Sequence, residues 1–463
     1  MGSPDPPGSK AVTVARSSLP KKEQGGITLL TCLSLVTATM VGTGVYTSLG
    51  FQLLTLQSGF SILCLWALGG LLSLCGALSY SELAARIPRS GGEYTYLSEI
   101  YHPALGFMAG FVSLVAGFAA PIALSAMAFG TYLHAAWPGC PERTAPMVAV
   151  IVISLGHLRS LTMSSRVQNV TTGVKFLLLG SFLLIGVWSA VRHPGSLKTL
   201  LPVRGSLDEL LHPAGGIALL FVLYAYSGWN ATTYLAGEVR DRQKTVGISL
   251  ILGTLAVTLL YVLINALFLT SAPAADLRGV LNVGSVAANH LIGPLGGSVM
   301  SGLIAVGLLA SISAMIWAGP RVTQRIGEDH LPFRKLALTS RNGIPRRATL
   351  LQLVLVLGLL SSGSFEAILV CSQIPLLICL ILGVGGVIVL RFQERSQPPS
   401  PGAQPLFSCP LYPLPPLLFI LCSAAGLVYS ALSKPHFAIA GVGIMIIPLA
   451  LYPWISRNRA KRS

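Results

Sequence analysis

Charged residues are scarce in this chain. Asp, Glu, Lys and Arg make up 10% of its 463 residues, whereas 53% are hydrophobic. An ordinary soluble domain carries roughly a quarter charged residues, so this composition excludes that class. The apolar runs are about 20 residues long and lack the alternation of a membrane barrel strand. We therefore expect an all-α integral membrane protein in a lipid bilayer.

Clustered nucleophiles, carboxylates and metal ligands are also missing. The eight histidines are scattered without metal-ligand spacing, so we expect no metal and no cofactor. Lys175 is the one charge deep in an apolar run, and an intramembrane enzyme needs more, so we do not expect an enzyme. The net charge of +16 comes from basic residues spread over the inner loops. That spread indicates topology and not nucleic-acid binding.

Twelve apolar segments are expected to cross the membrane as helices within a transporter domain at residues 25–455. Residues 1–24 are polar and lack an apolar core, so they are expected to form a disordered cytoplasmic tail and not a signal peptide. Residues 456–463 are expected to form a basic cytoplasmic tail. Basic residues concentrate in the loops on the side of both termini, which predicts a multi-pass protein of the cell membrane with both termini cytoplasmic. The segments lie near residues 27–55, 60–85, 104–136, 145–163, 167–191, 213–236, 246–270, 297–324, 348–362, 367–391, 412–432 and 437–455.

Two of these segments contain a break in the middle. The first reads VGTGVY at residues 41–46, and the sixth reads YAYSGWN at residues 224–230. An unwound turn in hydrocarbon frees backbone groups, which is tolerable only where the break lines a cavity. The two breaks are five segments apart, and because five is an odd number, the second set of segments enters the membrane from the opposite side. The pattern predicts inverted repeats at residues 25–191 and 213–391, with helices 11 and 12 appended at residues 412–455 and helices 1 and 6 discontinuous.

The chemistry of the two breaks suits an amino acid. The exposed N–H groups of Gly42, Thr43 and Gly44, backed by the positive end of the following half-helix, suit a carboxylate. Carbonyl groups in the second break suit an ammonium group. The alternative is that Gly-x-Gly only lets helices pack closely, and the matching positions of the two breaks favour a binding site. We therefore expect the two breaks together to bind an amino acid.

Three other positions carry specific expectations. Lys175 lies in the fifth segment, roughly 13 Å from its inner boundary at 1.5 Å per residue. A charge at that depth indicates a functional role, the alternative being a lysine that snorkels along a tilted helix. Glu82, near Arg86 and Arg89, is expected to form a cytoplasmic gate network or surface pairs more readily than a proton relay. Cys140, in the outer loop PGCPE, is either a free thiol or bonded to an accessory subunit.

Five motifs, in order along the chain, resemble the amino acid–polyamine–organocation (APC) superfamily, and within it the L-type amino acid transporter and permease branch. They are MVGTGVYTS at 40–48, GALSYSELAARIPRSGGEYTYL at 76–97, YAYSGWN at 224–230, GEVRDRQKTV at 237–246 and RVTQRIGEDHLP at 321–332. The resemblance covers residues 25–455 and implies the leucine-transporter-like fold and substrate translocation by alternating access, with Tyr224 as an aromatic gate. Carried over by position, it also implies a set of substrate-binding residues: Val41, Gly42, Thr43, Gly44, Val45, Tyr224, Ala225, Tyr226, Ser227, Gly228 and Asn230.

The resemblance also implies a role for Lys175. Some members of the family carry a lysine whose ammonium group occupies the place of a sodium ion, next to the broken first helix and hydroxyl groups of the eighth. Ser311 and Ser313 are the candidates here. Sodium coupling is then not expected, and Lys175 acts either as a proton carrier or as a fixed cation that supports exchange.

Neither break contains an acidic residue, so we expect a small or medium neutral amino acid as the substrate, carried by an exchanger or a proton-coupled symporter. Cationic amino acids or polyamines are the alternative substrates. A channel has little use for one discontinuous helix in each repeat. A sensor that binds amino acids on the same fold without moving them stays open as an alternative.

Overall fold

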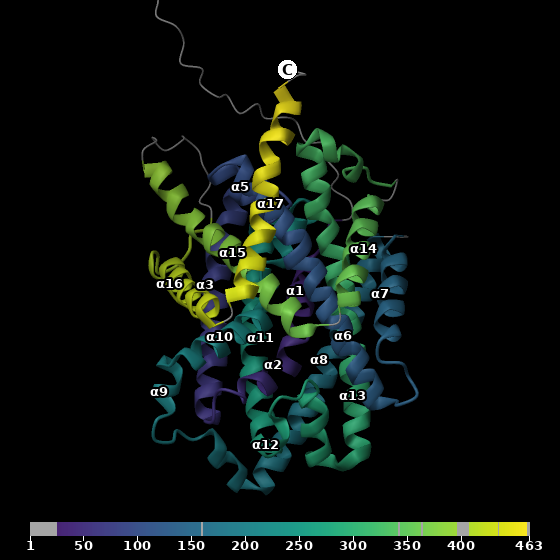
Figure 1. The fold of residues 1–463 in the computed structure, drawn as a ribbon, viewed down its shortest axis with the longest axis vertical. Helices are drawn as coiled ribbons and strands as arrows, with labels where there is room; N and C mark the ends of the chain where they lie inside the picture. The colour runs from purple at the N-terminus through teal and green to yellow at the C-terminus, as the bar shows by residue number, and fades with distance from the viewer. Residues whose placement is uncertain are drawn as a thin grey trace, which may run out of the picture.

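The structure, a computed structural model, is a bundle of helices (Figure 1). Within the described residues it contains no strand, only an isolated bridge between Ile27 and Val239, so the predicted all-α class is confirmed. The structure describes residues 26–158, 161–340, 343–362, 364–395, 407–433 and 435–460. The predicted tail at residues 1–24 lies outside these ranges, and the last helix continues to Ala460, beyond the predicted end of the transporter domain.

Nine helical stretches in the described part of the chain are long and apolar enough to cross a membrane. They comprise α1 (Leu29–Met40) with α2 (Gly44–Gln52), α3 (Gly59–Arg86), α5 (Pro103–Val112) with η1 (Ser113–Ala119) and α6 (Ala120–Ala136), part of α8 (Leu161–Arg192), α11 (Arg242–Ser271), α13 (Val283–Asp329), α15 (Phe365–Arg395), α16 (Leu414–Ser433) and α17 (Pro435–Ala460).

Shorter helices occupy the other three segments predicted to cross. These helices are α7 (Thr144–His157), α10 (Pro213–Tyr226) and α14 (Arg346–Ser362). The connections hold α4 (Glu93–Ile100), α9 (Ser206–Leu211), α12 (Ala274–Leu277), and the 3-10 helices η2 (Pro194–Leu200), η3 (Ala231–Glu238) and η4 (Leu331–Leu336). In Figure 1, α9 and α12 lie at the end of the bundle opposite to the C-terminus.

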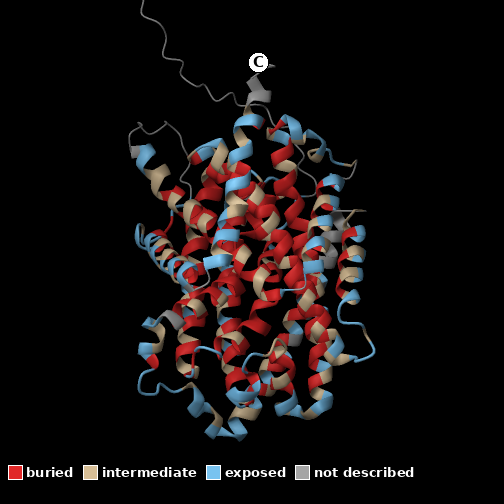
Figure 2. Cartoon of the chain, viewed as in Figure 1, coloured by how far each residue is buried: buried red, intermediate tan, exposed pale blue. Residues whose placement is uncertain are grey.

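The surface of the bundle shows how it meets the bilayer. Buried residues fill the interior, and exposed positions follow the outer helices (Figure 2). Many exposed side chains are large and apolar, including Leu177, Leu184, Leu421 and Leu432. Hydrocarbon chains of lipids are an apolar solvent, so such a surface is stable in a membrane and not in water.

Local sequence explains where several helices begin and bend. The Ser58 hydroxyl accepts a hydrogen bond from the Ser61 N–H and caps the N-terminus of α3. Pro103 starts α5, where its missing N–H is not needed. The predicted segment 297–324 lies within the longer α13, which is kinked at Gly293, where φ is +79°. Glycine reaches this conformation without steric cost.

An aromatic group ties the broken helices to the rest of the bundle. The Tyr226 hydroxyl at the end of α10 donates to the Trp66 carbonyl of α3 at 2.9 Å. The ring of Trp66 packs edge-on against Tyr261 of α11, with ring centroids 5.3 Å apart. A side chain at Gly76 would meet the Trp229 ring at 2.6 Å, so a glycine there admits the large ring. These contacts pack α3 and α11 against the end of α10 and the second break.

Glu82 is the centre of a charge cluster at the end of α3. Its carboxylate pairs with Arg86 at 2.7 Å, accepts two hydrogen bonds from Arg391 of α15 and accepts another from the Cys409 N–H. The expected pair with Arg86 is therefore present, whereas Arg89 pairs with Glu99. Because Glu82 is fully buried, these partners offset the cost of removing its charge from water.

Candidate functional site

The first break separates α1 from α2. Helix α1 ends at Met40 and α2 begins at Gly44, as expected from the weak helix formers between them. The Gly42 N–H donates to the Met40 carbonyl at 2.7 Å. The N–H groups of Thr43, Gly44 and Val45 meet no acceptor among the described residues. These three groups stand at the positive end of α2, so the free donors lie one residue further along than the sequence suggested.

The second break follows Tyr226, where α10 ends, and η3 begins at Ala231. Gly228 has φ +97°, and a Cβ there would lie 3.0–3.2 Å from Thr39 of α1. Both the conformation and the close approach require glycine. The carbonyl groups of Tyr226 and Ser227 accept no hydrogen bond within the described part of the chain. They are therefore available to a donor.

The two breaks lie against each other. The Thr39 hydroxyl donates to the Gly228 carbonyl at 3.0 Å, and the hydroxyl groups of Thr43 and Tyr224 lie 2.9 Å apart. Gly44 packs so closely on the Ala225 backbone that an added Cβ would lie within 3.0 Å of it. Segments about 180 residues apart in sequence thus form one contact inside the bundle.

Tyr261 of α11 connects both breaks. Its hydroxyl donates to the Met40 carbonyl at the end of α1 and lies 3.0 Å from the Ala225 carbonyl of α10. Both carbonyls belong to the last turn of a helix, where no intrahelical donor follows. Sequence reasoning missed Tyr261, because nothing in the seventh segment marks its single tyrosine as a partner of the breaks.

A cavity of about 500 Å³ lies beside the second break. Three of the expected binding residues, Ser227, Gly228 and Asn230, line it. The other expected residues, in the first break and at the end of α10, are buried next to these three and do not line the cavity. The remaining lining residues carry no charge: Thr39, Gly117, Phe118, Pro121, Ala231, Tyr234, Met315, Leu376 and Leu380.

Lys175 reaches the first break from α8. Its ammonium group donates to the Val41 carbonyl at 2.5 Å and to the Ser311 hydroxyl of α13 at 2.6 Å, and Ser311 in turn donates to Val41 at 2.7 Å. Lys175 is only 2% exposed and has no carboxylate partner among the described residues, so it does not snorkel to the surface. Ser313 lies elsewhere, 2.9 Å from the His157 ring nitrogen. Of the two candidate serines, the structure brings only Ser311 to Lys175.

Glu93 is a second residue that sequence reasoning missed. It begins α4, is fully buried, and accepts hydrogen bonds from the side chains of Asn230 and Tyr234. Tyr234 also lies 3.1 Å from the Ser113 hydroxyl. Burial raises the pKa of the Glu93 carboxyl above its ordinary value. Glu93 therefore holds two residues that line the cavity, from a helix that connects two spans.

Cys140 lies in the loop between α6 and α7, partly exposed, and is a free thiol in the structure. The other cysteines are free as well. The described residues therefore contain no intrachain disulfide. Because Cys140 lies in a loop, its thiol could still form a disulfide with another chain.

Two discontinuous helices that meet at a cavity inside an apolar bundle are the arrangement of a membrane transporter. The comparison with known sequences agrees, since the profile of the amino acid permease family matches residues 27–451. This chain belongs to the amino acid permease family.

Individual relatives have the same character over nearly their whole length. The chain is 29% identical to the serine/threonine exchanger SteT of Bacillus subtilis (strain 168) over 406 residues, which are 86% of this chain and 89% of that protein. It is 27% identical to the cystine/glutamate transporter of Homo sapiens over 432 residues, 91% of this chain and 82% of that protein. It is 25% identical to the large neutral amino acids transporter small subunit 2 of Homo sapiens over 450 residues, which are 93% of this chain and 80% of that protein. The family and these relatives are transporters and not enzymes.

Proposed function

We propose that this protein carries amino acids across the cell membrane by secondary active transport with alternating access. The observation that carries the proposal is the contact between the two breaks, which brings free N–H groups of α2 near free carbonyl groups after α10. A zwitterion satisfies both sets at once. A carboxylate bound at Thr43 to Val45 displaces the contact between Thr43 and Tyr224, and Tyr224 then acts as the gate over the substrate.

The substrate is a neutral amino acid. The residues that line the cavity include no charged side chain, so neither a cationic nor an anionic substrate finds a counter-charge there. Two of the similar proteins are named for serine, threonine or large neutral amino acids. The cystine/glutamate transporter is also similar, and cationic amino acids or polyamines remain the alternative substrates.

Lys175 supplies the coupling element. Its ammonium group bonds to the Val41 carbonyl inside the first break, so any movement of α1 changes the environment of the charge. As a fixed cation it supports exchange, and as a proton carrier it supports symport. A cation already in this position leaves no reason for sodium at the same carbonyl.

The topology belongs to the same proposal. Twelve membrane helices form two inverted repeats, at residues 25–191 and 213–391, and helices 11 and 12 follow. Both termini lie in the cytoplasm, with short tails at residues 1–24 and 456–463. The position of both breaks in matching helices, five spans apart, supports this organisation.

Cys140 is the candidate attachment point for an accessory subunit. It is partly exposed in a loop on the outer side of the proposed topology, and its thiol forms no disulfide among the described residues. One similar protein is named as a small subunit, which fits a two-chain assembly. Co-purification that is lost on reduction, and lost in Cys140→Ser, tests this bond.

Counterflow in liposomes tests the transport function. Purified protein is reconstituted with an unlabelled amino acid inside, and a panel of labelled amino acids is offered outside, with and without a proton or sodium gradient. We expect trans-stimulated uptake of neutral amino acids that does not require sodium. Binding of amino acids without trans-stimulated uptake would instead establish the sensor.

A further inference from the structure

A second cavity lies on the flank of the bundle, separate from the one at the second break. The empty space between its lining residues, open space at its mouth included, is about 400 Å³, and the lining comes from α10, α15 and α16. Ile217 and Phe221 are only partly buried, and α16 presents apolar residues such as Leu421 and Val428 outward. One of the three helices that line the cavity, α16, therefore faces the lipid, which places a source of apolar ligands beside it.

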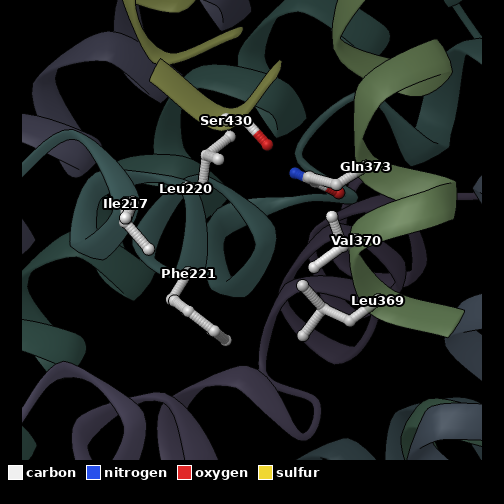
Figure 3. Close-up of a pocket in the computed structure, with 7 residues that line it drawn as sticks. All are labelled: Ile217, Leu220, Phe221, Leu369, Val370, Gln373 and Ser430. Carbon is white, nitrogen blue, oxygen red and sulfur yellow. The ribbon is translucent and has the colours of Figure 1, made fainter. Parts of the chain in front are cut away.

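The lining combines an apolar wall with two polar groups (Figure 3). Leu220, Leu369 and Val370 make up much of the wall together with the partly buried residues. The hydroxyl of Ser430 and the amide of Gln373 point toward one another across one end of the cavity, as Figure 3 shows. The seven lining residues include no charged side chain.

These two polar groups lack partners. Gln373 is 4% exposed and Ser430 is 3% exposed, no hydrogen bond of either side chain is found within the described residues, and both side chains border the open space of the cavity. Buried polar groups in an apolar medium are normally hydrogen-bonded, because leaving them unpaired costs free energy. An amide and a hydroxyl can each donate and accept. A guest with one hydroxyl satisfies both.

We propose that this cavity is a site for a neutral lipid alcohol drawn from the bilayer, with its hydroxyl between Gln373 and Ser430 and its apolar body along Leu220, Phe221 and Val370. A phospholipid head group does not fit this chemistry, because it would bring a phosphate to a cavity without a basic side chain. An acyl chain alone fills the apolar part but leaves the amide and the hydroxyl unpaired.

The occupant acts on the carrier through α10. Leu220 and Phe221 lie about one helical turn before Tyr224, the residue in contact with the first break. The Ser48 hydroxyl of α2 donates to the Phe221 carbonyl at 3.3 Å, and the ring of Phe221 stacks on Phe51 with centroids 5.2 Å apart. A lipid held between α10, α15 and α16 fastens α10 in the arrangement described here. It therefore stabilises this state and slows exchange.

Photolabelling tests the site without relying on transport, so its outcome is distinct from that of the proposed function. The full-length protein is placed in phosphatidylcholine nanodiscs with a photoreactive sterol as the probe of a lipid alcohol, and the labelled peptides are mapped. We expect labelling of residues 217–221 and 369–373, reduced at least fivefold by excess unlabelled sterol.

Variants separate head-group recognition from simple partition into the cavity. Gln373→Leu and Ser430→Ala should each lower the labelling at least fivefold, and Ile217→Trp should block it by filling the cavity. Ser423→Ala is the control for Ser430→Ala, because Ser423 also lies on α16, is fully buried and does not line the cavity. Each variant is first checked for a monodisperse profile in size-exclusion chromatography, and Ser430→Ala, the smallest change, keeps the test available if Gln373→Leu does not fold.

The proposal also predicts function in the reconstituted carrier. Sterol should raise the melting temperature of the wild type and slow exchange, and both effects should disappear in Ser430→Ala. Labelling that maps to other helices would overturn the proposal. So would equal labelling by a photoreactive phosphatidylcholine, or labelling that is unchanged in both Gln373→Leu and Ser430→Ala.

Discussion

The contact between Gly44 and Ala225 gives the sharpest prediction about the breaks. A Cβ on Gly44 would overlap the Cα and Cβ of Ala225, whereas a Cβ on Gly42 would meet its nearest atoms at 3.8 Å, an ordinary contact. Overpacking of this kind costs about 1–3 kcal/mol, a roughly 5- to 150-fold change in the equilibrium between packed and separated breaks. We expect Gly44→Ala to lose most of its counterflow activity and Gly42→Ala to fold normally.

The assay measures melting temperature and counterflow for both variants in the same lipid. Gly44→Ala should melt at a lower temperature and transport at least fivefold more slowly. Gly42→Ala should keep its melting temperature, and any loss of transport should then be a rise in KM, because the added methyl group stands near the N–H groups that receive the carboxylate. A Gly44→Ala protein with normal stability and normal uptake would refute the packing of the two breaks described above.

Three further predictions concern the residues around the breaks. Lys175→Met keeps the apolar stem but removes the ammonium group, so exchange measured by counterflow should slow at least tenfold. Ser311→Ala should slow exchange to a smaller extent, and Ser313→Ala should leave it unchanged. Equal effects of the two serine variants would contradict the role given to the bond between Lys175 and Ser311. Tyr261→Phe removes the hydroxyl shared by both breaks and should destabilise the protein by about 1 kcal/mol in thermal unfolding, with normal stability contradicting the bridge. Burial raises the pKa of the Glu93 carboxyl above its ordinary value of 4.5, so the wild type loses stability as pH rises from 4.5 through the pKa of the folded state. Glu93→Gln does not titrate and should therefore become more stable relative to wild type over that range. Melting temperatures of the two proteins that change in parallel with pH would contradict this assignment.

Composition and spacing were sufficient for the class of fold and for the two breaks. Long apolar runs fix a helical membrane protein, because a backbone in hydrocarbon must bond to itself. VGTGVY and YSGWN mark the breaks because glycine, serine and asparagine interrupt such runs. The depth of Lys175 within its segment was enough to identify it, since a deep charge requires a partner.

Partners across the bundle could not be predicted from the sequence. Nothing local distinguishes Ser311 from Ser313, yet they bond to different helices because successive helical positions face different directions. Glu93 and Asn230 are 137 residues apart, and only the packing of α4 under the second break brings them together. Residues of the first break were expected to line the cavity, but their burial against α10 depends on the relative position of two half-helices.

The central claim is that the two breaks together recognise both ends of an amino acid. The most direct measurement is competition in counterflow between a transported neutral amino acid and two analogues, the amine without its carboxylate and the acid without its amino group. The account predicts that each analogue competes at least tenfold more weakly than the amino acid. Equal competition by either analogue would mean that one break does not contact the substrate, and would contradict the account.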